Sequence, residues 1–287
     1  MTLRALLPLL LVTLAACSAP TPPASTTTPA TTATAAQPAS ADEPAGTAGA
    51  AAASTTAGAP DAAADAAADQ ALAANPGGLV PGQDFVEIKD AEPWMPLNGK
   101  VEVVEVFGYV CPACAAFNPL VTAWKNKLPA DVRFSYVPAP FGPEWNPYAK
   151  SFYVADAMGI ADRAHDALIR AIHVDQSMPG EGDPVNEQAI ADFYGKYGAN
   201  PKEFLSTMNS FTVAAQVNRG KQFMQRTGAN STPTLIVNGK YRVTGTSFED
   251  MLRIASALIA QERAKMAAGA APAAPATTTP ATAAAQG

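Results

Sequence analysis

Val101-Glu-Val-Val-Glu-Val-Phe-Gly-Tyr-Val-Cys-Pro-Ala-Cys114 is the stretch that decides the fold, because it joins a predicted strand to a predicted helix. Residues 101–107 are mostly Val and Phe, which is typical of a buried strand. Residues 115–127 have the spacing of an amphipathic helix, and Pro112 takes its first position. A C-x-x-C pair at such a strand-to-helix switch indicates dithiol redox chemistry.

The two thiols of this motif have different surroundings. Cys111 precedes the helix, where free backbone N–H groups and the helix dipole stabilise a thiolate. That lowers the pKa of the thiol and makes it a nucleophile at neutral pH. Cys114 lies one turn into the helix, close enough to close a small disulfide ring. We therefore expect Cys111 to be the reactive thiol and Cys114 the buried, resolving one.

Two other interpretations of the cysteine pair exist, a zinc site and a purely structural disulfide. Zinc prefers four ligands. The remaining candidates are Cys17 and two histidines, His165 and His173, which are eight residues apart and not the four that suit a helical metal pair. Redox activity is therefore the favoured interpretation, and we expect no metal.

The N-terminus predicts export. Residues 1–16 have a charged start and a short apolar core, as a secretory signal peptide does, and are too short for a stable membrane span. They end in Leu14-Ala15-Ala16-Cys17, which resembles the lipobox of bacterial lipoproteins. That resemblance implies cleavage before Cys17 and a lipid on its thiol; an ordinary signal peptide is the alternative. Because Ser18 follows in place of Asp, the outer membrane is favoured.

Residues 17–77 consist mainly of Ala, Thr, Pro, Ser and Gly. Such a composition cannot bury a core, so we predict a disordered linker. Part of it, residues 60–74, has Pro and Asp at its start and Ala throughout, which favours a helix, although an isolated helix of this length is marginal. The tail 267–287 repeats the bias and is also predicted to be disordered.

Residues 78–266 remain for one folded domain. The net charge of −6 argues against a nucleic-acid partner. The hydrophobic patterns predict strands at 84–88, 101–107, 131–137, 234–237 and 241–243, and helices at 112–127, 146–158, 161–174, 186–197, 201–209, 211–226 and 248–266. The first strand–helix–strand unit implies a parallel pair of strands, and Asn238-Gly239 predicts a hairpin between the last two.

This order of elements is that of an α/β, thioredoxin-like fold with an inserted helical subdomain at about 142–212. Glu105–Cys114, together with Ser231-Thr-Pro-Thr-Leu-Ile-Val-Asn-Gly-Lys-Tyr241, resembles the DsbA family of thiol:disulfide oxidoreductases. The resemblance covers about 78–265, the whole folded unit. It implies no cofactor beyond the cysteine pair.

The resemblance also implies roles for residues outside the C-x-x-C motif. In the family, the proline that corresponds to Pro233 is cis and packs against the dithiol. It turns the backbone of Thr232 toward the site, where an extended substrate can pair with it. We expect Thr232 and Pro112 to contact substrate. The alternative for Pro233 is an ordinary trans proline at the start of a strand.

Glu105 lies in the middle of the apolar strand, where burial of a carboxylate tends to raise its pKa. The family has an acid at this place, beneath the second cysteine, where it accepts and returns a proton. The alternative is an edge glutamate that reaches solvent or a lysine. The family's usual lysine partner for this acid is not evident in the sequence, since Tyr136 or a neighbour occupies that strand position.

Ala113 is a departure from the family pattern, because strongly oxidising members carry His between the cysteines. Without it, only the helix dipole and local N–H groups stabilise the thiolate. We therefore expect a less oxidising potential than in those members. His165 and His173 occupy helical positions and are interpreted as surface or packing residues.

The DsbA-family resemblance implies a periplasmic enzyme that introduces disulfide bonds into exported proteins, and the lipobox resemblance at Cys17 implies that it is tethered to a membrane. Reduced exported proteins are its substrates, and a membrane quinone reductase of the DsbB type reoxidises it. A reductase or isomerase of the same fold is the first alternative, because only potential and partner set the direction. A metal-delivery lipoprotein is the second; it requires a further ligand, usually His, near the pair.

Overall fold

The computed structural model describes residues 62–73 and 78–270 of the chain. The signal peptide predicted at 1–16 and the lipidation site predicted at Cys17 lie outside these residues, as does most of the predicted tail. Within the described residues the core is a five-stranded sheet with the order β1-β5-β4-β2-β3. Its strands are β1 Phe85–Glu87, β2 Val101–Phe107, β3 Val132–Pro138, β4 Thr234–Val237 and β5 Tyr241–Val243.

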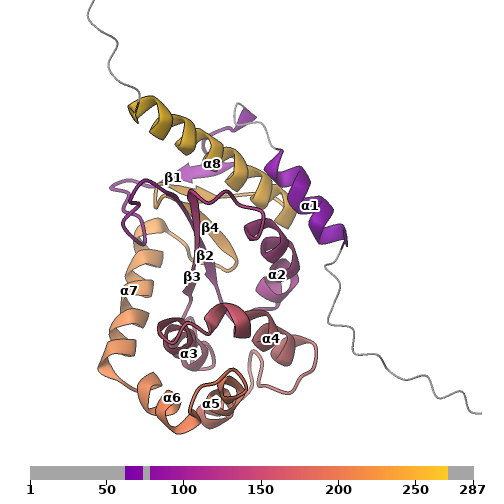
Figure 1. The fold of residues 1–287 in the computed structure, drawn as a ribbon, viewed down its shortest axis with the longest axis vertical. Helices are drawn as coiled ribbons and strands as arrows, with labels where there is room; N and C mark the ends of the chain where they lie inside the picture. Colours follow the sequence, from indigo (N-terminus) through magenta and orange to yellow (C-terminus); the bar gives the residue numbers. More distant parts are fainter. Residues whose placement is uncertain (1–61, 74–77, 271–287) are drawn as a thin grey trace, which may run out of the picture. The chain divides into compact units, whose positions relative to one another are not determined.

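The central strand β2 ends shortly before the C-x-x-C motif. It pairs with β3 in parallel and with β4 antiparallel, and the predicted hairpin β4–β5 forms at Asn238-Gly239. Every residue of β2 is buried, because strands flank it and helices cover both faces (Figure 1). This full burial explains why its sequence is apolar on both faces and does not alternate.

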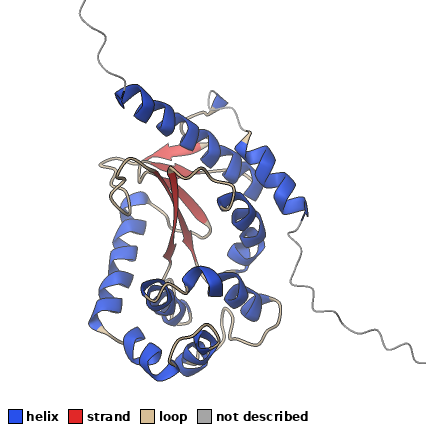
Figure 2. Ribbon diagram, viewed as in Figure 1, coloured by secondary structure: helices blue, strands red, loops and turns tan. Residues whose placement is uncertain are grey.

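Helices surround the sheet, as Figure 2 shows. They are α2 Pro112–Lys125, α3 Trp145–Ala157, α4 Ala161–His173, α5 Glu187–Gly195, α6 Pro201–Met208, α7 Phe211–Thr227 and α8 Phe248–Ala270. The helices α3 to α6 form the predicted insertion between β3 and α7. The last helix, α8, continues beyond its predicted end at residue 266. No helix in the described part of the chain combines the length and apolar composition that a membrane span requires.

The predicted disordered linker 17–77 is wrong for its last part, because α1 spans Ala62–Leu72 and packs on α2 and α8. Ala68 is fully buried in the same apolar cluster as Trp124. Lys127 forms ion pairs with Asp65 and Asp69 at 3.3 and 2.8 Å. Small alanine side chains let the helix axes approach closely, and this tertiary contact stabilises a helix that would be marginal in isolation.

Candidate active site

The active-site candidate is built at the N-terminus of α2. Cys111 caps the helix with extended backbone angles (φ −77°, ψ 117°), and Pro112 occupies the first turn. The Cys114 backbone N–H donates to Cys111 Sγ at 3.4 Å. Both cysteines are present as thiols and both are buried. The free N–H groups of the helix start therefore point at one sulfur, that of Cys111.

The two thiols differ sharply in acidity. The pKa of Cys111 is lowered to about 5, chiefly by its hydrogen bond with the Cys114 side chain. An interaction with Thr232 and the backbone N–H groups of Cys114 and Ala113 add to this, and they outweigh burial. The pKa of Cys114 is raised by the hydrogen bond with Cys111, by burial and by the charge of Glu105. Cys111 is thus a thiolate at neutral pH and Cys114 a thiol.

The loop before β4 lies against this dithiol. The Thr232–Pro233 peptide bond is cis, as expected, and not trans. The Cys111 Sγ atom lies 3.6 Å from the Thr232 backbone oxygen, to which only the protonated thiol donates. Residues 121 positions apart in sequence therefore meet at one sulfur atom. The exposed side chain of Pro112 lies next to the cysteine at the start of α2.

Glu105 is buried, with 3% of its surface exposed, and stands opposite Tyr136 in the parallel register of β2 and β3. The pKa of its carboxyl is raised to about 8: burial is the main cause, the charge of Lys125 opposes it, and the charges of Cys111 and Asp166 add to it. Its Oε2 atom is buried without a hydrogen-bond partner in the described structure. Glu105 therefore does not reach solvent, although Lys125 supplies the lysine that the alternative interpretation named.

Lys125 is the residue that the sequence interpretation missed. The strand position opposite Glu105 is Tyr136, and a cation acts on Glu105 from the last turn of α2. The Lys125 Nζ group donates to the Tyr136 hydroxyl at 2.9 Å. The signal was available: Cys114, Asn118, Val121 and Lys125 follow the 4-3-4 spacing that lines one face of a helix.

The histidines pack, as interpreted. His165 is buried and stacks on Tyr136 with ring centroids 4.3 Å apart, and burial lowers its pKa to about 3. The Nε2 atom of His173 lies 2.8 Å from the Tyr109 backbone oxygen. No group of three or more His, Cys, Asp or Glu is placed to hold a metal ion among the residues described.

Comparison with known proteins gives a consistent result. A family model described as Thioredoxin matches residues 97–256. The Thiol:disulfide interchange protein DsbA of Pseudomonas aeruginosa is 37% identical over 196 residues, which cover 67% of this chain and 90% of that protein. Its counterpart from Burkholderia cepacia is 34% identical over 179 residues, which cover 62% and 82%.

The solved structures include the oxidoreductase DsbA from Xylella fastidiosa, with 44% identity and a TM-score of 0.62. The match covers 65% of this chain and 98% of that chain. It therefore includes almost the whole of that relative, and the remaining third of this chain has no counterpart in it.

Proposed function

Because the chain belongs to the thioredoxin-like DsbA family of thiol:disulfide oxidoreductases that form disulfides, we propose that Cys111 and Cys114 are its redox centre. We further propose that it works in the periplasm on a lipid tether at Cys17. The observation that carries the redox assignment is the position of Cys111, a low-pKa thiol at the helix N-terminus beside the Thr232 backbone oxygen. Low thiolate pKa at such a site is characteristic of reactive cysteines.

In the proposed reaction, a client thiolate attacks Cys111 Sγ of the Cys111–Cys114 disulfide. The disulfide breaks, a mixed disulfide forms, and Cys114 leaves as a thiolate that takes a proton from Glu105. A second thiolate of the client then attacks the client sulfur that is bonded to Cys111 Sγ in the mixed disulfide. The client leaves oxidised and Cys111 leaves as its stabilised thiolate. Two electrons pass from the client to the enzyme.

Substrate would lie along the loop that ends in Pro233. The Thr232 backbone faces Cys111 and can pair with an extended peptide, and Pro112 borders the same sulfur. The lipobox resemblance at Cys17 supports the tether, with the outer membrane favoured by Ser18. A disulfide-bearing membrane partner of the DsbB type would reoxidise the dithiol.

Single-cysteine variants test the two roles. Cys111→Ser should abolish oxidation of a reduced client peptide, because no low-pKa leaving group remains. Cys114→Ser should instead accumulate mixed disulfides when it is given clients that carry a disulfide, because the Cys111 thiolate attacks the client disulfide and no second enzyme thiol is left to displace the client. Non-reducing electrophoresis with mass spectrometry measures both. Adducts in Cys111→Ser and none in Cys114→Ser would reverse the assignment.

A further inference from the structure

Tyr109, two residues before Cys111, is held at both of its polar ends by one helix of the insertion. Its hydroxyl lies 3.2 Å from Nδ1 of His165, and its backbone oxygen lies 2.8 Å from Nε2 of His173. Both histidines belong to α4 and are eight residues apart, which is about two turns of a helix. The spacing that does not suit a metal pair is thus the spacing that lets α4 contact one tyrosine twice.

Tyr109 belongs to a short turn that joins β2 to Cys111. The Cys111 backbone N–H donates to the Gly108 oxygen at 3.1 Å, which closes this turn. The ring of Trp145, at the start of α3, lies so near Gly108 that a Cβ atom there would be 2.1 Å from it. Val110 is fully buried. The turn that places Cys111 at the start of α2 is therefore covered by α3 and α4 of the insertion.

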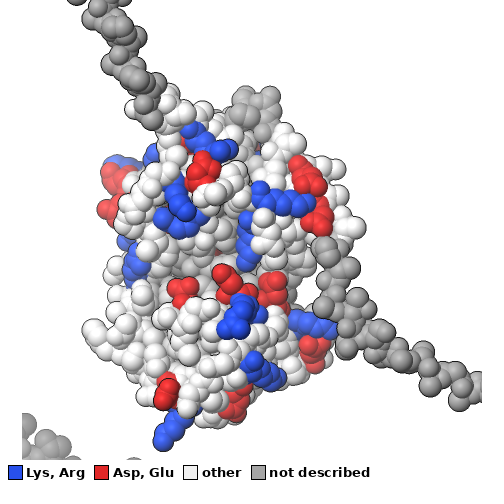
Figure 3. All heavy atoms as spheres, viewed as in Figure 1, with Lys and Arg blue, Asp and Glu red and all other residues white. Residues whose placement is uncertain are grey.

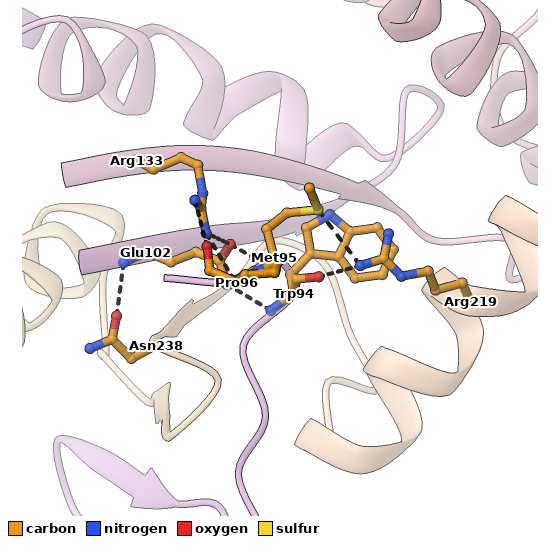
Figure 4. Close-up of polar contacts among 7 residues, drawn as sticks. All are labelled: Trp94, Met95, Pro96, Glu102, Arg133, Arg219 and Asn238. Atoms are coloured by element: carbon orange, nitrogen blue, oxygen red, sulfur yellow. Dashed lines mark hydrogen bonds and ion pairs between the residues drawn. The ribbon is translucent and has the colours of Figure 1, made fainter. Parts of the chain in front are cut away.

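The strand before this turn is fixed by contacts of its own (Figure 4). Near the start of β2, the fully buried Glu102 carboxylate accepts from the backbone N–H groups of Trp94 and Met95 and from Arg133 Nη2 at 2.7 to 3.0 Å. The Glu102 backbone N–H donates to Asn238 Oδ1 at 2.8 Å. These contacts hold β2 to β3 and to the β4–β5 turn, and they do not reach the turn that follows the strand.

The hydrogen bond at the Tyr109 backbone oxygen fixes which nitrogen of His173 carries a proton. A peptide oxygen only accepts, so Nε2 must be the donor. The imidazolium form of the ring also has an Nε2–H, so this contact does not require one particular charge on His173. His165 differs, because burial lowers its pKa to about 3 and its ring stays neutral.

The charged side chains around α4 have partners of their own. Charges of both signs lie near the middle of the face in Figure 3, where Figure 1 shows β3 between α7 and α2. Asp162 and Asp166 of α4 line a cavity of about 740 Å³ there, and Asp166 accepts from Asn118 Nδ2 at 3.0 Å. Arg170 and Asp175, at the end of α4, form an ion pair at 3.1 Å. Among the described residues, the hydrogen bonds between Tyr109 and α4 come from the two histidines.

The Tyr109 backbone oxygen matters to Cys111 because it carries partial negative charge close to a thiolate. The His173 N–H compensates that charge and holds the peptide between residues 109 and 110 in one orientation. A carbonyl that loses its only strong donor costs free energy, and the peptide rotates toward another donor. Both effects would remove stabilisation from the thiolate, since Cys111 Sγ depends on its place at the start of α2.

We propose that His173 is a positioning residue for the dithiol. By donating to the Tyr109 backbone oxygen, it fixes the turn that presents Cys111 to the N-terminus of α2, and so it helps to stabilise the thiolate. This inference rests on the proposed redox role of Cys111. The insertion then contributes to the redox properties of the site as well as covering the sheet.

The test follows thiolate absorbance against pH in the reduced full-length protein. His173→Leu should raise the pKa of Cys111 by about one unit, because the donor to the Tyr109 oxygen is lost. His173→Gln, whose amide keeps an N–H donor, should titrate close to wild type. Arg170→Leu is the matched control: it deletes an exposed cation from the same last turn of α4 and should leave the titration unchanged.

Glutathione equilibria at pH 7 provide the second readout. His173→Leu should favour the disulfide about tenfold more than wild type does, which is a potential ~30 mV lower. Tyr109→Phe removes the hydroxyl but keeps the backbone oxygen, so the effect of His173→Leu should have the same size in that background. An effect that disappears in Tyr109→Phe would assign the action to the hydroxyl and overturn the inference.

Two further results would also overturn it: an unchanged Cys111 pKa in His173→Leu, or an equal shift in His173→Gln or Arg170→Leu. If His173→Leu does not fold, the wild-type ring decides. Two-bond ¹H–¹⁵N correlations of neutral His173 should show the proton on Nε2, and a proton on Nδ1 would contradict the contact. Wild-type protein that fails to oxidise client thiols would contradict the proposed function, whereas the thiolate titrations would still test His173.

Discussion

At the scale of single residues, the proposed redox chemistry depends most on Cys111 Sγ. Cys111 combines a helix N-terminus with a hydrogen bond from the Cys114 backbone N–H. These contacts stabilise the reduced, anionic state, whereas nothing comparable stabilises a thiolate at Cys114. Because the reduced state is the one stabilised, each such contact makes the disulfide more oxidising.

The Cys111 pKa predicts how the reduction potential depends on pH. Above pH 5, reduction places two electrons and one proton on the pair, because Cys111 stays a thiolate. The potential should then fall by about 30 mV per pH unit up to neutrality, and by about 60 mV per unit below that pKa. Glutathione equilibria between acid and neutral pH measure the slope. A slope that stays at the larger value up to pH 7 would exclude a low-pKa Cys111.

The same lowered pKa of Cys111 predicts how the stability of the reduced protein depends on pH. The folded-state pKa of Cys111 is below its usual value of 9.0, so folding favours the thiolate. This contribution to the free energy of unfolding is complete above the usual value and is lost as the pH falls through about 5. Urea unfolding of reduced protein should show the loss, and reduced Cys111→Ser, which has no thiol to titrate there, should not.

A third prediction concerns Ala113, which lies directly before Cys114 in the C-x-x-C motif. Ala113→His adds a cation near the thiolate, so it should raise the potential and lower the pKa of Cys111 together. An interaction of roughly 1.4 kcal/mol corresponds to ~30 mV in a two-electron couple. Thiolate absorbance and glutathione equilibria measure the two quantities. Ala116→His, exposed on the same helix but outside the motif, is the control. An unchanged Cys111 pKa in Ala113→His would mean that residue 113 does not set the potential.

At the scale of elements, α2 carries more than the cysteines. Cys111 caps its N-terminus, Cys114 lies in its first turn, and Lys125 in its last turn lies beside Tyr136. Lys127, two residues beyond its end, forms ion pairs with Asp65 and Asp69 of α1. Its apolar residues Phe117, Val121 and Trp124 pack between the sheet, α1 and α8. A displacement of α2 would therefore affect both thiols and the charge that faces Glu105.

Substitution of one buried alanine, Ala68, tests the packing of α1. Ala68→Asp places a carboxylate in a fully buried position, so α1 should separate from α2 and α8. The cost to global stability is limited to the free energy of docking α1, since the helix can release and leave the domain folded. Hydrogen exchange should show lost protection across 62–72. Ala66→Asp, on the exposed side of α1, should retain it; equal loss in both variants would contradict the observed packing.

At the scale of the whole molecule, two apolar clusters organise the described residues. One joins the sheet to the helical insertion and includes both cysteines, and the other joins the sheet to α1, α2 and α8. Both meet at β2, so the strand that leads into the dithiol is buried from both sides. This burial is what gives Glu105 its raised pKa.

The proposed tether is also a property of the whole molecule. Cys17→Ala should move the protein from the membrane fraction to the soluble periplasmic fraction, because it removes the only thiol that the lipobox resemblance assigns to lipid. Fractionation with immunoblotting measures this, and the dithiol activity of the released protein should be unchanged. A Cys17→Ala protein that stays fully in the membrane fraction would exclude this anchor.

Much of the architecture follows from local patterns in the sequence. The bounds of β4 and β5 follow from a hairpin turn, and the helices of the insertion follow from apolar spacing and caps such as Asn186, Asn200 and Ser210. The position of Cys111 at a helix start is local as well. Each of these depends on residues a few positions apart, which is why the sequence by itself determined them.

Other features depend on residues that are distant in the sequence, and only the tertiary structure decided them. The docking of α1 depends on the space that α2 and α8 leave between them. The amino-acid composition of residues 62–72 does not predict whether such a space exists. Lys125 meets Tyr136 because α2 folds back over β3, and Asp166 faces Glu105 because α4 of the insertion covers the same side. Electrostatic interactions depend on distance in space, so the charges that set the proton affinity of Glu105 became visible only in the packed fold.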